Sequence, residues 1–309
     1  MIPRVLLAAE EAAGAETLKR LLESPAEPVA VLTSLPETGP GSRIVQVARD
    51  AGVELLPAAR VRDPDFGEAI RSLDVDVLLN VHSLHLIAEA VLRAPRLGCF
   101  NLHPGPLPEY AGLNTPAWAI YHDAPEYGVT LHWMEPKVDA GDVAYQERFP
   151  IEPGATALSL GIECTRRGLG LVDRLLEALA RDSVPRTAQD LDRRRYFARG
   201  SAPEDGVVRW ARPAVEVERL SRAFDYGPFR SPWGRLTSRL GGRAVELGRL
   251  TPGSVGTPAP PGSLEVASDG SLEAATLDGW VRIRSVWVDG RRTDPDALLA
   301  LGRRFAEQD

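Results

Sequence analysis

Short apolar segments alternate with segments of helical period through the first half of this chain, and this alternation limits the possible folds more than any other feature. The apolar segments have the length of buried strands and span residues 5–8, 29–33, 53–56, 75–81 and 98–103. The helical patterns between them span residues 14–23, 43–51, 65–73 and 88–94. This order predicts a doubly wound, Rossmann-like α/β domain, in which helices cover both faces of a parallel sheet. Ligands of such a domain bind at the carboxyl ends of the strands.

A second, smaller domain is predicted from the last third of the chain. Strands at residues 129–134 and 143–151 and a long helix at 156–181 complete the first domain. After a segment rich in Asp, Arg, Pro and Ser comes a helix at 213–223, and then strand-like segments separated by Pro-Gly and Asp-Gly turns, at residues 243–250, 262–267, 272–276 and 279–287. We therefore expect a first domain at residues 1–185, a linker at 186–206 and a small β-barrel domain at 207–309.

Composition excludes several classes of protein. The two cysteines, Cys99 and Cys164, belong to no Cys-x-x-Cys pair or Cys/His cluster, so neither a disulfide framework nor a metal site is predicted. The first turn lacks the Gly-x-Gly-x-x-Gly pattern of a dinucleotide site. The apolar start of the chain is too short for a signal peptide and no apolar segment has membrane-spanning length, so we expect a cytoplasmic protein.

Charge argues against a nucleic-acid partner without ruling out tRNA. The formal net charge of the 309-residue chain is −7, and Lys19 and Lys137 are its only lysines. A protein that binds phosphate backbones normally presents a basic surface. The run Arg193–Arg195 is the one basic cluster near the linker, and both a phosphate contact and a solvated surface remain open for it.

Asn101, His103 and Asp139 are the candidate catalytic residues. Asn101 and His103 lie two residues apart at the end of a predicted strand that Pro104 terminates, so their side chains share a face. Asp139 follows a second strand. The amide suits stabilisation of an oxyanion, the imidazole can move a proton near neutral pH, and the carboxylate can orient the imidazole. This set suits acyl transfer to an amine, although each residue alone is also common in purely structural turns.

The run from Asn101 to Gln146 resembles the folate-dependent formyltransferase family. Four steps carry the resemblance, in order: Asn-Leu-His-Pro, Leu-Pro-Glu-Tyr-Ala-Gly, Gly-Val-Thr-Leu-His-Trp-Met and Asp-Ala-Gly-Asp-Val. Asn101, His103 and Asp139 fall on the family's catalytic Asn, His and Asp. The region after Gly206 is similar, more weakly, to the C-terminal domain of several of these enzymes. The resemblance implies 10-formyltetrahydrofolate as formyl donor, an amine as acceptor and no metal.

The family also implies a mechanism and a folate site. The amine attacks the formyl carbon, Asn101 and protonated His103 stabilise the oxyanion, and Asp139 stabilises the imidazolium and helps to relay the proton to the departing folate nitrogen. The pterin is held largely by main-chain groups of two loops, which correspond here to His85, Leu86 and Ile87 and to Glu135, Pro136, Lys137, Val138 and Asp139. For His82 and His85 a structural role stays equally open, and we expect His122 and His132 to be packing or surface residues.

The loop after the Leu-Pro step bears on the identity of the acceptor. Methionyl-tRNA formyltransferases usually carry a basic loop after the Leu-Pro step, whereas this chain carries Glu109 there. We therefore expect the amine of an amino acid or of a carrier-tethered aminoacyl group in specialised biosynthesis, enclosed by aromatic side chains from among Tyr110, Trp118, Tyr121 and Trp133. Methionyl-tRNA formyltransferase, sugar-nucleotide N-formyltransferase and 10-formyltetrahydrofolate hydrolase are the alternatives, and the oligomeric state stays open.

Overall fold

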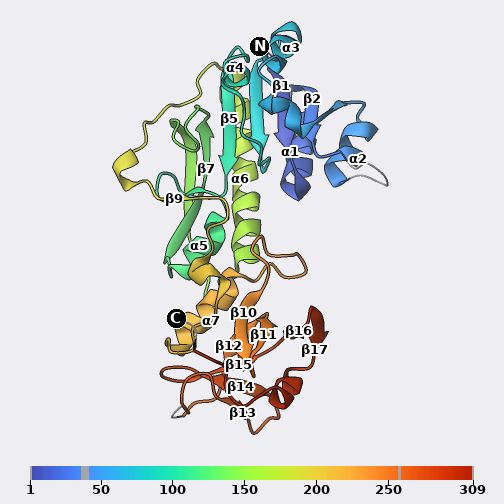
Figure 1. Cartoon of the computed structure of the whole chain (residues 1–309). Coiled ribbons are helices and arrows are strands. Elements are labelled where there is room, and N and C mark those ends of the chain that lie inside the picture. The colour runs from blue at the N-terminus through green and yellow to red at the C-terminus, as the bar shows by residue number, and fades with distance from the viewer. Residues whose placement is uncertain (1, 36–41, 257–258, 308–309) are drawn as a thin grey trace. The chain divides into compact units, whose positions relative to one another are not determined.

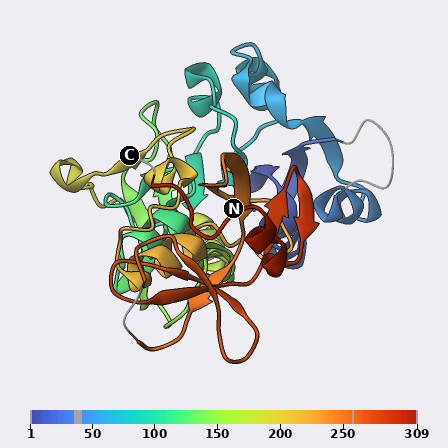
Figure 2. The ribbon, with the colours of Figure 1, turned by 60° about the horizontal axis from the view of Figure 1, so that its bottom comes forward.

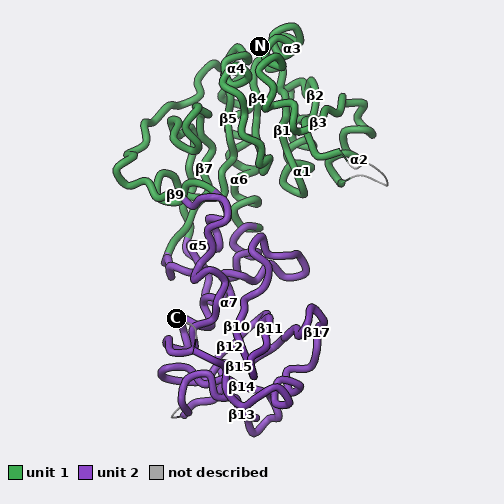
Figure 3. Tube along the Cα trace, viewed as in Figure 1, with its two compact units in different colours: residues 1–112, 126–149, 162–196 green, residues 113–125, 150–161, 197–309 purple. Residues whose placement is uncertain are grey.

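The structure, a computed structural model, describes residues 2–35, 42–256 and 259–307 (Figure 1). The chain divides into two compact units (Figure 3). The first comprises Met1–Gly112, Glu126–Phe149 and Ile162–Tyr196, and the second comprises Leu113–Pro125, Pro150–Gly161 and Phe197–Asp309. Each unit is thus built from segments distant in the sequence. The division at residues 185 and 206 remains our proposal for where independently folding domains meet.

A seven-stranded sheet forms the centre of the first unit, in the order β3-β2-β1-β4-β5-β7-β8. Its strands are β1 (Arg4–Ala9), β2 (Glu27–Thr33), β3 (Glu54–Pro57), β4 (Val77–Val81), β5 (Gly98–His103), β7 (Glu126–Trp133) and β8 (Val143–Pro150). Strands β1 to β5 pair in parallel, as the alternating pattern predicts, whereas β7 pairs antiparallel with β5. The predicted doubly wound, Rossmann-like class is confirmed, with an antiparallel strand beside the parallel set.

Helices cover both faces of this sheet (Figure 1). The helices of this unit are α1 (Glu11–Glu23), α2 (Arg43–Asp50), α3 (Phe66–Ser72), α4 (Glu89–Leu92) and most of α6 (Ala157–Ala180). Apolar side chains of α3 and α4 form one buried cluster with Leu78 and Cys99 of the sheet. Helix α6 packs on the other face, where a Cβ atom at Gly168 would lie 3.0 Å from both Cδ atoms of Leu102. Because Asn101 and His103 alternate with Leu102, they share the face of Cys99 and α3.

The second unit contains two antiparallel four-stranded sheets, drawn in orange to red in Figure 2. One has the order β10-β11-β16-β17 and the other β12-β15-β14-β13. Their strands are β10 (Leu236–Leu240), β11 (Arg243–Leu247), β12 (Leu250–Pro252), β13 (Leu264–Val266), β14 (Leu272–Ala275), β15 (Trp280–Ile283), β16 (Val286–Val288) and β17 (Arg291–Thr293). Helices α5 (Thr115–Tyr121) and α7 (Ala214–Ala223) accompany them. Stacked rings of Trp210 and Phe305, with centroids 4.6 Å apart, lie in the core of this unit.

Two strands predicted in the second unit are wrong in extent. Residues 243–250 form β11 and the start of β12, and residues 279–287 form β15 and most of β16, because the chain passes from one sheet to the other at both places. The crossing points touch, since the Gly248 N–H donates to the Ser285 carbonyl. A Cβ atom at Gly248 would lie 2.2 Å from Ser285 Oγ, so a side chain there would displace the Ser285 hydroxyl. The strands β10 and β17 escaped the sequence analysis.

The remaining elements are short. They are β6 (Ala111–Gly112), β9 (Tyr196–Phe197) and 3-10 turns at Ala58–Arg62, Leu191–Arg193, Pro203–Gly206 and Pro295–Ala300. Across the described ranges, every helix is too short or too polar to cross a membrane.

Candidate active site

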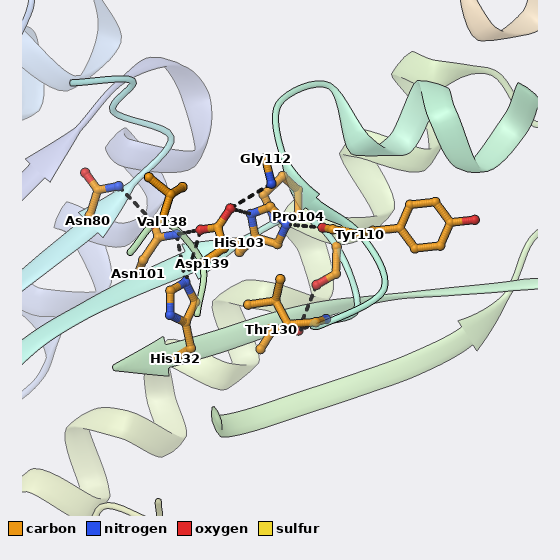
Figure 4. Close-up of polar contacts among 12 residues, drawn as sticks. Asn80, Asn101, His103, Pro104, Tyr110, Gly112, Thr130, His132, Val138 and Asp139 are labelled. Carbon is orange, nitrogen blue, oxygen red and sulfur yellow. Dashed lines mark hydrogen bonds and ion pairs between the residues drawn. The ribbon is translucent and has the colours of Figure 1, made fainter. Parts of the chain in front are cut away.

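Three polar side chains form a row across neighbouring strands of the central sheet, near the carboxyl end of β5. Asn80 of β4 pairs in register with Asn101 of β5, and Asn101 pairs in register with His132 of β7. Figure 4 shows the three side chains directed toward one another. His132, predicted to be a packing or surface residue, is buried, and in addition its ring contacts Asn101 and Asp139 within the cluster. Sequence analysis missed it because the register of β7 on β5 depends on a long connection.

Asp139 reaches this row from the turn between β7 and β8 and is almost fully buried. One carboxylate oxygen, Oδ2, accepts a hydrogen bond of 2.8 Å from the Gly112 N–H and lies 3.7 Å from His103 Nδ1. The other, Oδ1, lies 3.4 Å from Asn101 Nδ2 and 3.4 Å from His132 Nε2. The structure thus brings the three predicted residues, Asn101, His103 and Asp139, into one cluster (Figure 4).

Main-chain groups fix the orientation of the amides in this cluster. The Asn80 Nδ2 group donates to the Ser83 carbonyl at 3.3 Å and to Asn101 Oδ1 at 2.8 Å. Because Asn101 Oδ1 is thereby the acceptor, its Nδ2 group faces Asp139 and His132 as a donor. His132 Nδ1 lies 2.7 Å from the Trp133 carbonyl, so Nδ1 carries the proton and Nε2 accepts from Asn101 at 3.1 Å. Asn101 therefore presents a donor to the centre of the site.

The same reasoning assigns the tautomer of His103. Its Nε2 lies 2.6 Å from the carbonyl oxygen of Tyr110, which can only accept, so Nε2 carries a proton. The other nitrogen, Nδ1, faces the Asp139 carboxylate. A proton that arrives at Nδ1 would therefore lie between the imidazole and a negative charge, which is the arrangement that stabilises an imidazolium.

Burial and charge act against each other in this pair. Burial lowers the pKa of His103, and the Asp139 carboxylate opposes that shift. Burial alone would raise the pKa of Asp139, but His103, His132 and the Gly112 N–H hold the pKa below its usual range. The Gly112 N–H donates to the Asp139 carboxylate whether or not His103 carries a second proton, so this contact favours the ionised carboxylate throughout the reaction. The site then holds a carboxylate beside a neutral base, a combination suited to receive a proton.

The two predicted folate loops border this cluster in the sequence and differ in exposure. In the first loop, Leu84 and Leu86 are 61% and 70% exposed, and Ile87 is half-buried. Between the leucines, His85 Nδ1 is buried without a hydrogen-bond partner among the described residues. In the second loop, Glu135, Pro136 and Lys137 are exposed and Val138 is half-buried. Exposed apolar groups beside an unpaired polar atom fit a surface that a ligand covers.

His82 is a strained residue at the start of the first loop. Its φ of 59° lies in the left-handed region, which non-glycine residues rarely occupy. Burial lowers its pKa, and the carboxylate of Glu11, also at a left-handed φ, opposes the shift. Strain of this kind persists where the surroundings fix the backbone, which is common beside functional sites.

The aromatic side chains predicted to enclose the acceptor each pack against other residues. Trp118 and Tyr121 belong to the second unit, where Trp118 stacks on Phe197. Tyr110 is buried against Tyr127, and the Trp133 indole N–H donates to the Pro185 carbonyl. The tyrosine and tryptophan side chains thus have packing partners, and an aromatic wall around the acceptor stays a prediction.

Neither cysteine is placed for chemistry. Cys99 and Cys164 are both free and buried, and burial raises the pKa of the Cys99 thiol to about 12. Within residues 2–35, 42–256 and 259–307, no three His, Cys, Asp or Glu side chains are grouped as metal ligands.

Comparison with known families gives two matches that together span most of the chain. The model of the family described as Formyl transferase matches residues 12–167. The model described as Formyl transferase, C-terminal domain, matches residues 201–300. The first match contains all of the cluster described above.

Individual relatives agree with these matches. The chain is 32% identical over 263 residues to a methionyl-tRNA formyltransferase of Roseiflexus castenholzii, covering 85% of this chain and 82% of that protein. It is 30% identical over 311 residues to a methionyl-tRNA formyltransferase of Thermobifida fusca, covering 98% and 97%. Its fold is similar, with a TM-score of 0.69 at 19% identity, to an N-formyltransferase of Helicobacter canadensis solved in complex with folinic acid and dTDP-3-aminofucose, covering 92% of this chain and 98% of that chain.

Proposed function

Because this chain belongs to the formyl transferase family and is an N-formyltransferase that uses 10-formyltetrahydrofolate, we propose an acceptor and a set of catalytic residues for it. The acceptor is the amine of an amino acid or of a carrier-tethered aminoacyl group in specialised biosynthesis. The catalytic residues are Asn101, His103 and Asp139. The observation that carries the assignment is that one amide donor, one neutral imidazole and one buried carboxylate converge within hydrogen-bond or ion-pair distance.

In the proposed reaction the amine nitrogen attacks the formyl carbon, and the carbonyl oxygen becomes an oxyanion. Asn101 Nδ2, held as a donor by Asn80, stabilises that oxyanion. The proton of the attacking amine passes to His103 Nδ1, where the Asp139 carboxylate stabilises the imidazolium. The bond from the formyl carbon to the folate nitrogen then breaks, and that nitrogen takes the proton. The imidazole returns to its neutral form.

We assign the folate to the loops at His85–Ile87 and Glu135–Asp139. Support comes from the exposed Leu84 and Leu86 side chains and from the unpaired, buried Nδ1 of His85. The assignment also places the formyl group of the folate beside Asp139, since this residue ends the second loop. The folate is a substrate here, so the protein's part is to bind and orient it.

Charge supports a compact acceptor over tRNA. The first unit, which carries the whole site, contains 26 acidic and 20 basic residues, a formal net charge of −6. Two members of the basic run near the linker are engaged inside this unit: Arg193 pairs with Glu109, and Arg194 donates to the Val138 carbonyl. A surface for phosphates needs cations that are free to neutralise them. Only Arg195 of the run has its guanidinium exposed without an ion pair among the described residues.

Methionyl-tRNA is the second candidate acceptor, because the relatives from R. castenholzii and T. fusca carry that name over most of this chain. An amino-sugar nucleotide is a further alternative, suggested by the H. canadensis complex with dTDP-3-aminofucose. A panel of acceptors separates the three. The purified chain should be given 10-formyltetrahydrofolate with amino acids, aminoacyl carrier proteins, amino-sugar nucleotides and charged initiator tRNA, at low and at physiological salt.

We predict the highest turnover with an amino acid or an aminoacyl carrier protein, and little change of KM with salt. A tRNA bound through contacts between several of its phosphates and basic side chains of the protein would lose about 10³-fold or more in affinity over the same change in salt. Preferred formylation of tRNA with that steep dependence would show that the acceptor proposal is wrong, while leaving formyl transfer itself intact.

His132 should act on the reaction through Asn101. Replacing His132 by Leu removes the acceptor of the Asn101 Nδ2 hydrogen bond. Because one neutral hydrogen bond contributes about 1 kcal/mol, we expect kcat/KM to fall by roughly 3- to 10-fold. Steady-state kinetics with a fixed acceptor measures the change. A loss as large as that of an Asn101 variant would instead assign a proton-transfer role to His132.

A further inference from the structure

The segment from Pro185 to Arg195, which we call the strap, is hydrogen-bonded to two loops that carry the site. It belongs to the first unit, as both loops do. Its Thr187 exchanges two main-chain hydrogen bonds with Val143, at 2.8 and 3.0 Å. At its other end, Arg195 donates to the Pro108 carbonyl and accepts from the Ala111 N–H. The strap therefore connects the turn of Asp139 to the loop that contains Gly112.

Gln189 lies at the middle of the strap and binds the turn of Asp139. Its Nε2 group donates to the Asp139 carbonyl at 3.1 Å and to the Gly141 carbonyl at 2.6 Å. The neighbouring Val138 carbonyl accepts from Arg194 Nη2 at 2.9 Å. Both protons of the Gln189 amide nitrogen are thus used, and three carbonyl groups of this turn are satisfied by side chains of the strap.

The backbone of this turn is unfavourable and is stabilised by these contacts. Asp139 has a φ of 52°, a left-handed conformation that is unfavourable for a non-glycine residue. Gly141 is also constrained, since a Cβ atom there would lie 2.1 Å from the Trp133 carbonyl oxygen. A turn with an unfavourable backbone relaxes unless its surroundings hold it, and relaxation would carry the Asp139 carboxylate away from His103.

The orientation of the Gln189 amide favours its contacts with the turn over a hydrogen bond to its own oxygen. With Nε2 on the two carbonyls, Gln189 Oε1 is buried and has no partner within the described part of the chain. A buried acceptor without a donor is unfavourable, because it has lost its hydrogen bonds to water. The opposite amide orientation would place an oxygen against two carbonyl oxygens, so the observed one is retained despite this cost.

We propose that Gln189 is a positioning residue, which sets the distance from the Asp139 carboxylate to His103 without contacting the substrates. The inference rests on the proposed function, because it gives Asp139 a role in the reaction. Arg194 supports the same turn through Val138. The strap, which lies between the two family matches, thereby helps to position the acid–base pair.

The test is Gln189→Met, which keeps the length of the side chain and removes both donors. The matched control is Gln46→Met on α2, where the glutamine is exposed and bonded to Asp50. Asp139→Asn is assayed beside them. We expect Gln189→Met to lower kcat by about tenfold, and up to roughly 10²-fold, because small displacements of reacting groups have effects of this size.

The pH profile supplies the readout that a loss of stability would not change. The Asp139 carboxylate opposes the lowering of the His103 pKa by burial, so a carboxylate that drifts away lets that pKa fall further. The acid limb of kcat against pH, which reports protonation of His103, should move to lower pH in Gln189→Met and stay unmoved in Gln46→Met. Hydrogen exchange of the amides at residues 139–143 should quicken in the first variant.

The outcomes separate the two claims. If Asp139→Asn is inactive while Gln189→Met matches Gln46→Met in kcat and in its acid limb, the role of Gln189 is refuted and the proposed function stands. A lower kcat with an unmoved limb and a lower melting temperature would make Gln189 merely structural, which also overturns the inference. Full activity of Asp139→Asn would refute the proposed function itself.

Discussion

Replacing Asn101 by Ala should lower the turnover of formyl transfer by about 10²-fold or more, as the loss of one oxyanion donor typically does. The reason is the orientation of the Asn101 amide, whose oxygen is occupied by Asn80 Nδ2 at 2.8 Å and whose nitrogen faces the reaction centre. Affinity for tetrahydrofolate should change little, because our folate assignment places the pterin on main-chain groups of other loops. Steady-state kinetics and a tetrahydrofolate titration of the same preparation measure both quantities.

Asn80→Ala is the companion variant. It leaves the Asn101 donor in place but removes the group that fixes its orientation, so we expect a loss smaller than that of Asn101→Ala. Near-normal turnover of Asn101→Ala with an accepted amine would remove the oxyanion role from this residue. Equal losses in the two variants would mean that the orientation of the amide matters as much as its presence.

Replacing Asp139 by Asn should lower turnover by about 10²- to 10⁴-fold, the range associated with loss of general acid–base function. The variant keeps the shape of the side chain and an oxygen for the Gly112 N–H, which donates to Asp139 at 2.8 Å. It removes the negative charge that opposes the lowering of the His103 pKa by burial. That pKa therefore falls, and the acid limb of the residual activity should move to lower pH.

Asp142→Asn is the matched control for this prediction. Asp142 belongs to the same turn region but directs its carboxylate to the exposed Arg186 guanidinium, at 3.2 Å. Exposed ion pairs contribute about 0–1 kcal/mol, so turnover and melting temperature should stay close to those of the parent protein. A loss in Asp142→Asn comparable to that in Asp139→Asn would show that the turn tolerates no change of charge, and that the role of Asp139 is not specific.

Local sequence patterns predict the parallel half of the central sheet well. Strands β1 to β5 are short and apolar and are separated by helical segments, so their type and order follow from periodicity alone. The same periodicity places Asn101 and His103 on one face, which the structure confirms through their contacts with Asp139. The antiparallel direction of β7 and the crossings near Gly248 and Ser285 depend on long-range pairing, which no local pattern contains.

The other residues of the site could not be predicted from the sequence, because they too depend on long-range pairing. His132 and Asn80 join the site because their strands pair in register with β5, and a shift of one residue would turn both side chains to the opposite face. Gln189 belongs to a segment with the composition of a solvated linker, and only the fold shows its amide on the turn of Asp139. Resemblance to a family identifies residues that relatives share, whereas these supporting contacts require the three-dimensional arrangement.

We propose that this cluster transfers a formyl group to an amine, and the fate of a labelled formyl group shows whether it does. The purified chain would receive 10-formyltetrahydrofolate carrying ¹³C in the formyl group together with the preferred acceptor. Mass spectrometry would then quantify labelled formamide and labelled formate. We predict one labelled formamide for each tetrahydrofolate released, and loss of that product in Asn101→Ala and Asp139→Asn. Release of tetrahydrofolate with labelled formate alone, at a rate independent of every amine supplied, would identify a hydrolase and refute transfer to an amine.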